Sequence, residues 1–151
     1  MKVLLAYLSF GLVFAYGCAP KISDLSGKTY KTLPTVDLCD LPKYRNQKVY
    51  LKCIYSGVEE YWNLNSIKNK ECSQQLQVDL DFVNDYDEIP KRYRRKMQKV
   101  HNNYPVSNLY LEAIGVFENE RGSYGHLGSH KSRFLVTKIK KIIMVKRENQ
   151  L

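Results

Sequence analysis

Hydrophobic and polar residues alternate along much of the chain after residue 48, which is the pattern of β-strands with one buried face. In VYLKCIY, residues 49–55, the side chains of Val49, Leu51 and Cys53 fall on one face and their neighbours on the other. Further strands are predicted over 60–65 (EYWNLN), 76–82 (LQVDLDF), 108–118 (NLYLEAIGVFE) and 132–145 (SRFLVTKIKKIIMV). The sequence therefore predicts a mainly β protein with five strands.

One helix is predicted between the third and fourth strands. Apolar residues recur there at spacings of three and four, at Ile89, Tyr93, Met97, Val100 and Tyr104. Pro90 suits a first helical turn, and Pro105 ends the segment. The opposite face is a basic patch of Lys91, Arg92, Arg94, Arg95, Lys96 and Lys99. Two interpretations of the patch stay open: a solvated helix face, or a contact for anionic lipid or an acidic partner.

The first eighteen residues, MKVLLAYLSFGLVFAYGC, contain one lysine near the start, a long uncharged run and small residues before a cysteine. This order is that of a secretory signal, so residues 1–17 are predicted to be a signal peptide. A transmembrane helix is the alternative, but the apolar run is shorter than the ~20 residues that span a bilayer.

Cys18 directly follows Gly17, which resembles the lipobox of bacterial lipoproteins, whose cysteine becomes the lipidated first residue. Ala15 and Tyr16 depart from the aliphatic and small residues usual in that motif, and they also fit ordinary signal cleavage. We expect a lipid-anchored protein of the bacterial cell envelope, with soluble secretion or a periplasmic location as the alternative. Residues 18–34 would then be a tether and residues 35–147 the folded domain.

The chain carries 24 Lys and Arg against 15 Asp and Glu, a formal charge of +9. The predicted signal peptide contains one lysine and no acidic residue, so the mature chain would carry +8. A basic balance of this size raises the affinity for polyanions in general without selecting one. Location in the envelope argues against nucleic acid and leaves the membrane, an envelope protein or another anionic partner.

Three cysteines follow Cys18: Cys39, Cys53 and Cys72. An exported chain with three such cysteines forms at most one internal disulfide, and the sequence leaves the pair open. Neither a CxxC motif nor the Cys/His spacing of a zinc site occurs. We therefore expect no structural metal and no cofactor.

The last two strands enclose a loop, residues 119–131, which contains RGSYGHLGSH. Its three glycines would each destabilise a helix by ~1 kcal/mol relative to alanine, so a β-hairpin loop is predicted. His126 and His130 therefore do not share a helix face, and the sequence offers them no convincing third metal ligand. We expect both histidines to be exposed to solvent.

Three strands, a helix and two strands follow one another in the order of the OB-fold, a five-stranded Greek-key barrel. A short helix or turn is predicted before them, where Leu38, Leu41 and Tyr44 stand at helical spacing. The segments DLPKYRNQKVYLKCIYSGVEE and VFENERGSYGHLGSHKSRFLVTKI resemble those of small uncharacterised bacterial OB-fold lipoproteins, the latter through Tyr-Gly-His-Leu-Gly. The resemblance covers residues 37–143 and implies an OB-fold-like barrel in a family without an established activity.

OB-folds bind ligands beside the loops that join strands one and two and strands four and five. Those loops are residues 56–60 and 119–131. The residues expected at this end of the barrel are Glu59, Glu60, Tyr124 and His126, with Trp62 along the adjoining face. A carboxylate beside an imidazole orients the ring for acid–base chemistry or pins the loop through a hydrogen bond. Since no nucleophile or metal accompanies them, we assign no catalytic residue and predict a candidate ligand-binding site.

The resulting prediction is a binding or scaffolding module rather than an enzyme, and two alternatives stay open. A nuclease or other metal-dependent phosphodiesterase would use Asp79 and Asp81 with Arg121, although an exposed strand face is the simpler explanation of two alternating aspartates. A polyanion or nucleic-acid binder would stack bases on Tyr61 and Trp62 beside the basic helix. Trp62 also suits a protein core.

Overall fold

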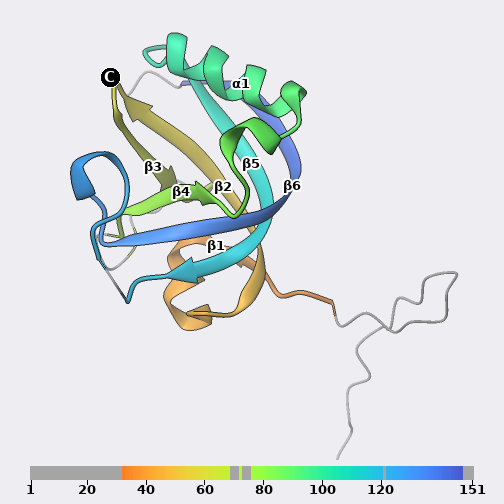
Figure 1. The fold of residues 1–151 in the computed structure, drawn as a ribbon, viewed down its shortest axis with the longest axis vertical. Helices are drawn as coiled ribbons and strands as arrows, with labels where there is room; N and C mark the ends of the chain where they lie inside the picture. The colour runs from red at the N-terminus through yellow and green to blue at the C-terminus, as the bar shows by residue number, and fades with distance from the viewer. Residues whose placement is uncertain (1–31, 69–71, 73–75, 121, 148–151) are drawn as a thin grey trace, which may run out of the picture. The chain divides into compact units, whose positions relative to one another are not determined.

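One mixed β-sheet dominates the structure, a computed structural model that describes residues 32–68, 72, 76–120 and 122–147 (Figure 1). Its strands are β1 (Thr35–Asp37), β2 (Lys48–Val58), β3 (Tyr61–Asn65), β4 (Val78–Phe82), β5 (Ser107–Glu118) and β6 (Ser132–Lys146). The described helices are α1 (Lys91–Asn102) and the short 3-10 helices η1 (Leu38–Tyr44), η2 (Tyr86–Glu88) and η3 (His126–Gly128). The predicted signal peptide, Cys18 and most of the predicted tether lie outside the described residues.

The sheet runs in the order β1, β2, β5, β6, β4, and β3 pairs with β2 beside this path. β1 pairs with β2 and β4 pairs with β6 in parallel, whereas the β2–β3, β2–β5 and β5–β6 pairs are antiparallel. β3 lies against β4 without a ladder between the described residues, so the sheet is not closed. The prediction of a mainly β protein is confirmed, but the sheet has six described strands and not five.

The additional strand is β1, which the sequence did not predict. The short helix or turn predicted around Leu38, Leu41 and Tyr44 is present directly after it as η1. The three residues of β1 pair in parallel with β2 before the chain turns into η1. The carboxylate of Asp37 accepts a hydrogen bond from the backbone N–H of Cys39 at 3.2 Å and so caps the start of η1. The hydroxyl of Ser66 donates to the same carboxylate at 2.8 Å. Asp37 therefore ends the strand and begins the helix.

The core follows the predicted alternation of apolar residues. β2 buries Val49, Leu51, Cys53 and Tyr55, and β5 buries every second residue from Leu109 to Phe117. Burying a large apolar side chain stabilises a fold by ~1.5–3 kcal/mol, so these central strands supply much of the stability. α1 lies over β5 and β6 (Figure 1) and buries Met97 and Val100 of the predicted apolar stripe, while Tyr93 packs partly buried against the core. Ile89 and Tyr104, the ends of that stripe, lie just outside the helix.

The sequence did not decide which cysteines pair, and in the structure the disulfide joins Cys39 to Cys72. It connects η1 to the segment between β3 and β4. Cys53 keeps a free thiol in the core at 0% exposure, and burial raises the pKa of that thiol. Cys53 therefore behaves as a small apolar core residue.

Candidate binding surface

A two-residue turn, Glu59-Glu60, joins β2 to β3. Val58 pairs with Tyr61 across it, and the backbone of Glu59 has a φ of 52°, in the left-handed region. Turns of this length favour Asn-Gly or Asp-Gly, because those residues adopt that region at little cost. Turn propensity therefore does not explain the two glutamates, and both are exposed.

The loop between β5 and β6 closes on itself as a smaller hairpin. The backbone N–H of Tyr124 donates to the carbonyl of His130 at 2.9 Å, and the N–H of His130 donates back at 3.0 Å. Gly125 has a φ of 70°, and a Cβ at this position would collide with the His130 ring, so only glycine fits. η3 at the tip presents Leu127, which is 85% exposed and has a φ of 50° that leucine rarely adopts.

A contact between His126 and Glu60 joins this loop to the β2–β3 turn. Nε2 of His126 lies 2.9 Å from a carboxylate oxygen of Glu60, and the Tyr61 ring meets the same imidazole edge to face at 5.8 Å between centroids. Glu60 and His126, placed at one end of the domain from the sequence, are thus in contact. We name the residues of these two segments the joined-loop surface: Val58, Glu59, Glu60, Tyr61, Tyr124, His126 and Leu127.

His130 differs from the expectation that both loop histidines are exposed, because it is only 4% exposed. Its Nε2 donates to the side-chain oxygen of Asn63 on β3, and its Nδ1 lies 2.9 Å from the hydroxyl of Ser129. The amide oxygen of Asn63 only accepts, so Nε2 carries a proton and donates the hydrogen bond to it. His130 therefore fastens the loop to β3, and both of its ring nitrogens are already hydrogen-bonded.

The sequence contained a signal for the burial of His130. This residue stands two positions before Ser132 and four before Phe134, in phase with the buried residues of β6. The predicted strand begins at Ser132, but the alternation of buried residues continues two positions further back to His130. Leu127 was also missed as a surface residue of interest, since its exposure depends on the conformation of the hairpin tip.

Asp79 on β4 lies beside the loop. The backbone N–H of Gly125 donates a hydrogen bond to its carboxylate. Burial raises the pKa of Asp79, and the charge of the nearby His130 opposes this shift. The carboxylate is thus a polar support for the hairpin tip.

Asp81, the second aspartate of the nuclease alternative, is held by Arg133. The guanidinium lies 2.7 Å from the Asp81 carboxylate and 2.8 Å from that of Glu118. The same guanidinium lies over the ring of Tyr124, 5.0 Å from its centroid, and so positions this predicted site residue. Arg121 lies outside the described residues. Asp81 therefore already has an internal ion-pair partner.

Trp62 supports the joined-loop surface from inside the domain. It is 6% exposed, and its Nε1 donates to the carbonyl of Glu59 at 2.7 Å. Its ring stacks on Tyr55 at 5.0 Å and meets His101 of α1 at 4.2 Å between centroids. The indole thus packs in the core and holds the turn in place, and its faces are not presented at the surface.

Part of the basic patch on α1 serves the fold. Arg94 forms an ion pair at 2.6 Å with an aspartate of η2, and Nζ of Lys96 donates to a β6 carbonyl at 2.8 Å. Arg92 lies over the neighbouring tyrosine ring at 4.7 Å. The side chains without a partner among the described residues are those of Lys91, Arg95 and Lys99. Their spacing of four residues aligns them along one stripe of the helix.

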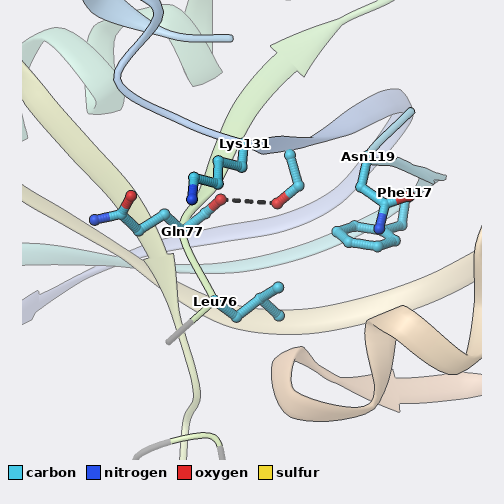
Figure 2. A pocket seen from close by; sticks show the side chains of 6 residues that line it. Leu76, Gln77, Phe117, Asn119 and Lys131 are labelled. Atoms are coloured by element: carbon cyan, nitrogen blue, oxygen red, sulfur yellow. Dashed lines mark hydrogen bonds between the residues drawn. The ribbon is translucent and has the colours of Figure 1, made fainter. Parts of the chain in front are cut away.

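A pocket of about 260 Å³ opens at the base of the loop (Figure 2). Its lining consists of Leu76, Gln77, Phe117, Asn119, Lys131 and Ser132. The hydroxyl of Ser132 donates to the carbonyl of Gln77 at 2.7 Å, and Lys131 and Leu76 lie on opposite sides of this hydrogen bond (Figure 2). The predicted site residues do not line the pocket, so the pocket and the joined-loop surface are separate features of the same loop region.

Within the described part of the chain, no three His, Cys, Asp or Glu side chains come together as a metal site requires. None of the described helices has the length and apolar character needed to span a bilayer. Comparisons with protein-family models, with curated proteins and with solved structures found no match to the chain. Its function therefore has to be inferred from the surface itself.

Proposed function

We propose that this chain is an exported, lipid-anchored binding or scaffolding module of the bacterial cell envelope. The signal-like N-terminus followed by Cys18 supports export and anchoring. The disulfide between Cys39 and Cys72 supports export independently, because such bonds persist in oxidising compartments. The joined-loop surface is the part of the domain that we assign to binding.

We further propose that β2 to β6 form a barrel of the OB type, to which β1 is added. Their order along the chain, with α1 between the third and fourth of these strands, supports this proposal. β5 returns to pair with β2, the first of the five, which is a Greek-key connection. In such a barrel, the joined-loop surface lies beside the usual ligand-binding face.

The contact between Glu60 and His126 is the observation that carries the binding function, because it locks two loops into one exposed surface. An exposed contact of this kind contributes only ~0–1 kcal/mol to the stability of the domain. The left-handed backbone of Leu127 lowers that stability, so the conformation of the loop is not explained by stability alone. Val58, Tyr61 and Leu127 are 48%, 52% and 85% exposed. Exposed apolar side chains that gather in one place mark interaction sites, so we assign this surface to a partner.

Site-specific photocrosslinking in the full chain tests the assignment. Benzoylphenylalanine replaces Tyr61 in one variant and, in a control, the exposed Lys48 at the end of β2 away from the turn. We expect a discrete adduct from position 61 alone, and a weaker one when His126→Ala uncouples the two loops. Equal labelling from both positions, or none from position 61, contradicts the assignment.

Anchoring is tested by the intact mass and membrane fractionation of the native protein beside a Cys18→Ala variant. A lipid mass on Cys18, with release of the variant from the membrane, supports the proposal. A bare chain that begins near Cys18 in the soluble fraction supports secretion in place of anchoring. An uncleaved chain in the cytoplasm contradicts export.

A second candidate function is contact with anionic lipid headgroups. The stripe of Lys91, Arg95 and Lys99, which has no partner among the described residues, favours it. Basic residues near such a surface contribute ~1 kcal/mol each. Replacing all three by glutamine should reduce cosedimentation of the Cys18→Ala chain with phosphatidylglycerol vesicles. The same replacement at the exposed Lys48, Lys68 and Lys131 is the control. Equal binding of the two triple variants excludes the helix as the contact.

A further inference from the structure

We propose that the chain self-associates by placing Leu127 of one copy in the pocket at the loop base of a second copy. This inference rests on the proposed function, because it uses the joined-loop surface. It names the partner of that surface as another copy of this chain.

Leu127 has the properties of an interface anchor. It stands at the apex of η3, 85% exposed, with a φ of 50°. The loop beneath it is already held by the contacts of His126 with Glu60 and of His130 with Asn63. Seating the side chain in a partner would therefore order little additional chain, which lowers the entropic cost of association. Leu127 therefore presents apolar surface to a partner from a loop that is already ordered.

The pocket has room for a leucine side chain, and its lining is mixed. Its volume is about 260 Å³. Leu76 and Phe117 form the apolar part of the lining, and the polar part consists of Gln77, Asn119, Lys131 and Ser132. Asn119 and Lys131 are exposed residues of the same pocket (Figure 2).

Charge complementarity favours a second copy as the occupant. The ammonium group of Lys131 has no ion-pair partner among the described residues, and neither has the carboxylate of Glu59 beside the joined loops. A leucine seated in the pocket would bring a glutamate of one copy toward Lys131 of the other. Anionic lipid would be repelled by Glu59 and Glu60, so a membrane is the weaker candidate for this surface.

The arrangement is also self-complementary. Asn119 and Lys131 stand at the two ends of the loop whose tip is Leu127, so one loop carries both the exposed leucine and part of the pocket lining. Two copies around a two-fold axis would exchange these leucines reciprocally and form a closed dimer. A one-way contact would instead extend into an open series of larger species.

Light scattering coupled to size-exclusion chromatography of the full chain in dodecylmaltoside micelles tests the contact. We expect the protein mass of a dimer, or of a series of larger species, and weakening of association by about thirtyfold or more in Leu127→Ser. Val106→Ser, which removes another apolar side chain that is 60% exposed, is the matched control and should associate as the parent does. Asn119→Trp, which fills the pocket from an exposed position, should weaken association as Leu127→Ser does.

Mixing the two defective variants gives the sharper result. Leu127→Ser keeps an intact pocket and Asn119→Trp keeps an intact Leu127, so the mixture should restore association that neither shows alone. Circular dichroism confirms that each variant is folded. A parent chain that stays monomeric at its highest soluble concentration overturns the inference, as does undiminished association of Leu127→Ser. A monomer that still forms the position-61 adduct with another protein overturns self-association and leaves the proposed function standing.

Discussion

The side chain of His130 donates a hydrogen bond to that of Asn63, a residue 67 positions earlier in the sequence. The bond fastens the glycine-rich loop between β5 and β6 onto β3 and so holds the hairpin tip beside the β2–β3 turn. Both partners are largely or partly buried, so the bond is protected from exchange with water. A substitution at Asn63 should therefore loosen the whole loop between β5 and β6.

Replacing Asn63 by leucine should destabilise the domain and loosen this loop. The buried Nε2–H of His130 would lose its acceptor, and an unsatisfied buried donor costs ~1–3 kcal/mol. Urea unfolding should show this loss, with faster hydrogen exchange between Tyr124 and His130. Asn65→Leu, at an exposed position of the same strand, should change stability by less than ~0.5 kcal/mol. Equal effects of the two variants would refute the role given to Asn63.

Asp79→Asn should stabilise the domain at neutral pH. Burial raises the pKa of Asp79 above its ordinary 3.8. The charge of Asp81 raises this pKa further, and the interaction with His130 lowers it. The folded chain therefore holds this proton more tightly than the unfolded chain, and stability falls as pH rises from near 3.8 through the raised pKa. Asparagine does not ionise, so the variant should have the higher Tm at pH 7.

Thermal unfolding followed by circular dichroism from pH 3 to pH 8 checks this prediction. The advantage of Asp79→Asn should vanish at pH 3, where the aspartate is protonated in both states. Asp81→Asn should lower the Tm at pH 7, because Arg133 loses a partner at 2.7 Å. A Tm for Asp79→Asn at or below that of the parent at pH 7 would count against a raised pKa.

His101→Phe should make the domain less sensitive to mild acid. Burial lowers the pKa of His101 below its ordinary 6.5, so the unfolded chain takes up the proton first and stability falls as pH drops through that region. Phenylalanine keeps the contact with Trp62 but loses the 3.2 Å hydrogen bond to the Tyr55 hydroxyl. The variant should therefore be ~1 kcal/mol less stable at pH 8, with a smaller deficit at pH 5.

Urea unfolding at both pH values measures this deficit. Tyr55→Phe, which removes the hydroxyl and keeps the histidine, is the matched control and should retain the full acid sensitivity. A deficit of His101→Phe that is the same at pH 5 and pH 8 would show that His101 does not supply the acid sensitivity.

Removing the disulfide should lower stability more than any of these changes. Cys39 and Cys72 are separated by 33 residues, and a cross-link closing a loop of that size stabilises by ~3–4 kcal/mol in the chain-entropy description. The double variant Cys39→Ser/Cys72→Ser should unfold at a correspondingly lower urea concentration. Adding a reductant should lower the midpoint of the parent and leave that of the variant unchanged. A parent midpoint insensitive to reductant would mean that the bond does not contribute.

Most elements of the fold could be predicted from the sequence, because strand and helix patterns are local. The alternation over 108–118 predicted β5, observed at Ser107–Glu118, and the pattern over 132–145 predicted β6, observed at Ser132–Lys146. The apolar stripe likewise predicted α1. β1 was not predicted, since three residues are too few for a periodic pattern and their strand state depends on pairing with β2. The signal peptide and the lipidation of Cys18 stay predictions.

By itself, the sequence determined most of the buried positions of the long strands and of α1 and where the loops lie along the chain, because periodic burial is a property of neighbouring residues, but it did not reveal the burial of His130. Only the tertiary structure decided which distant residues meet. Glu60 contacts His126, whereas the nearby Trp62 turns into the core, and Cys39 takes Cys72 as its partner while Cys53 stays free. A local pattern specifies the environment of a side chain but not its partner, since the partner is set by the path of the chain through the sheet.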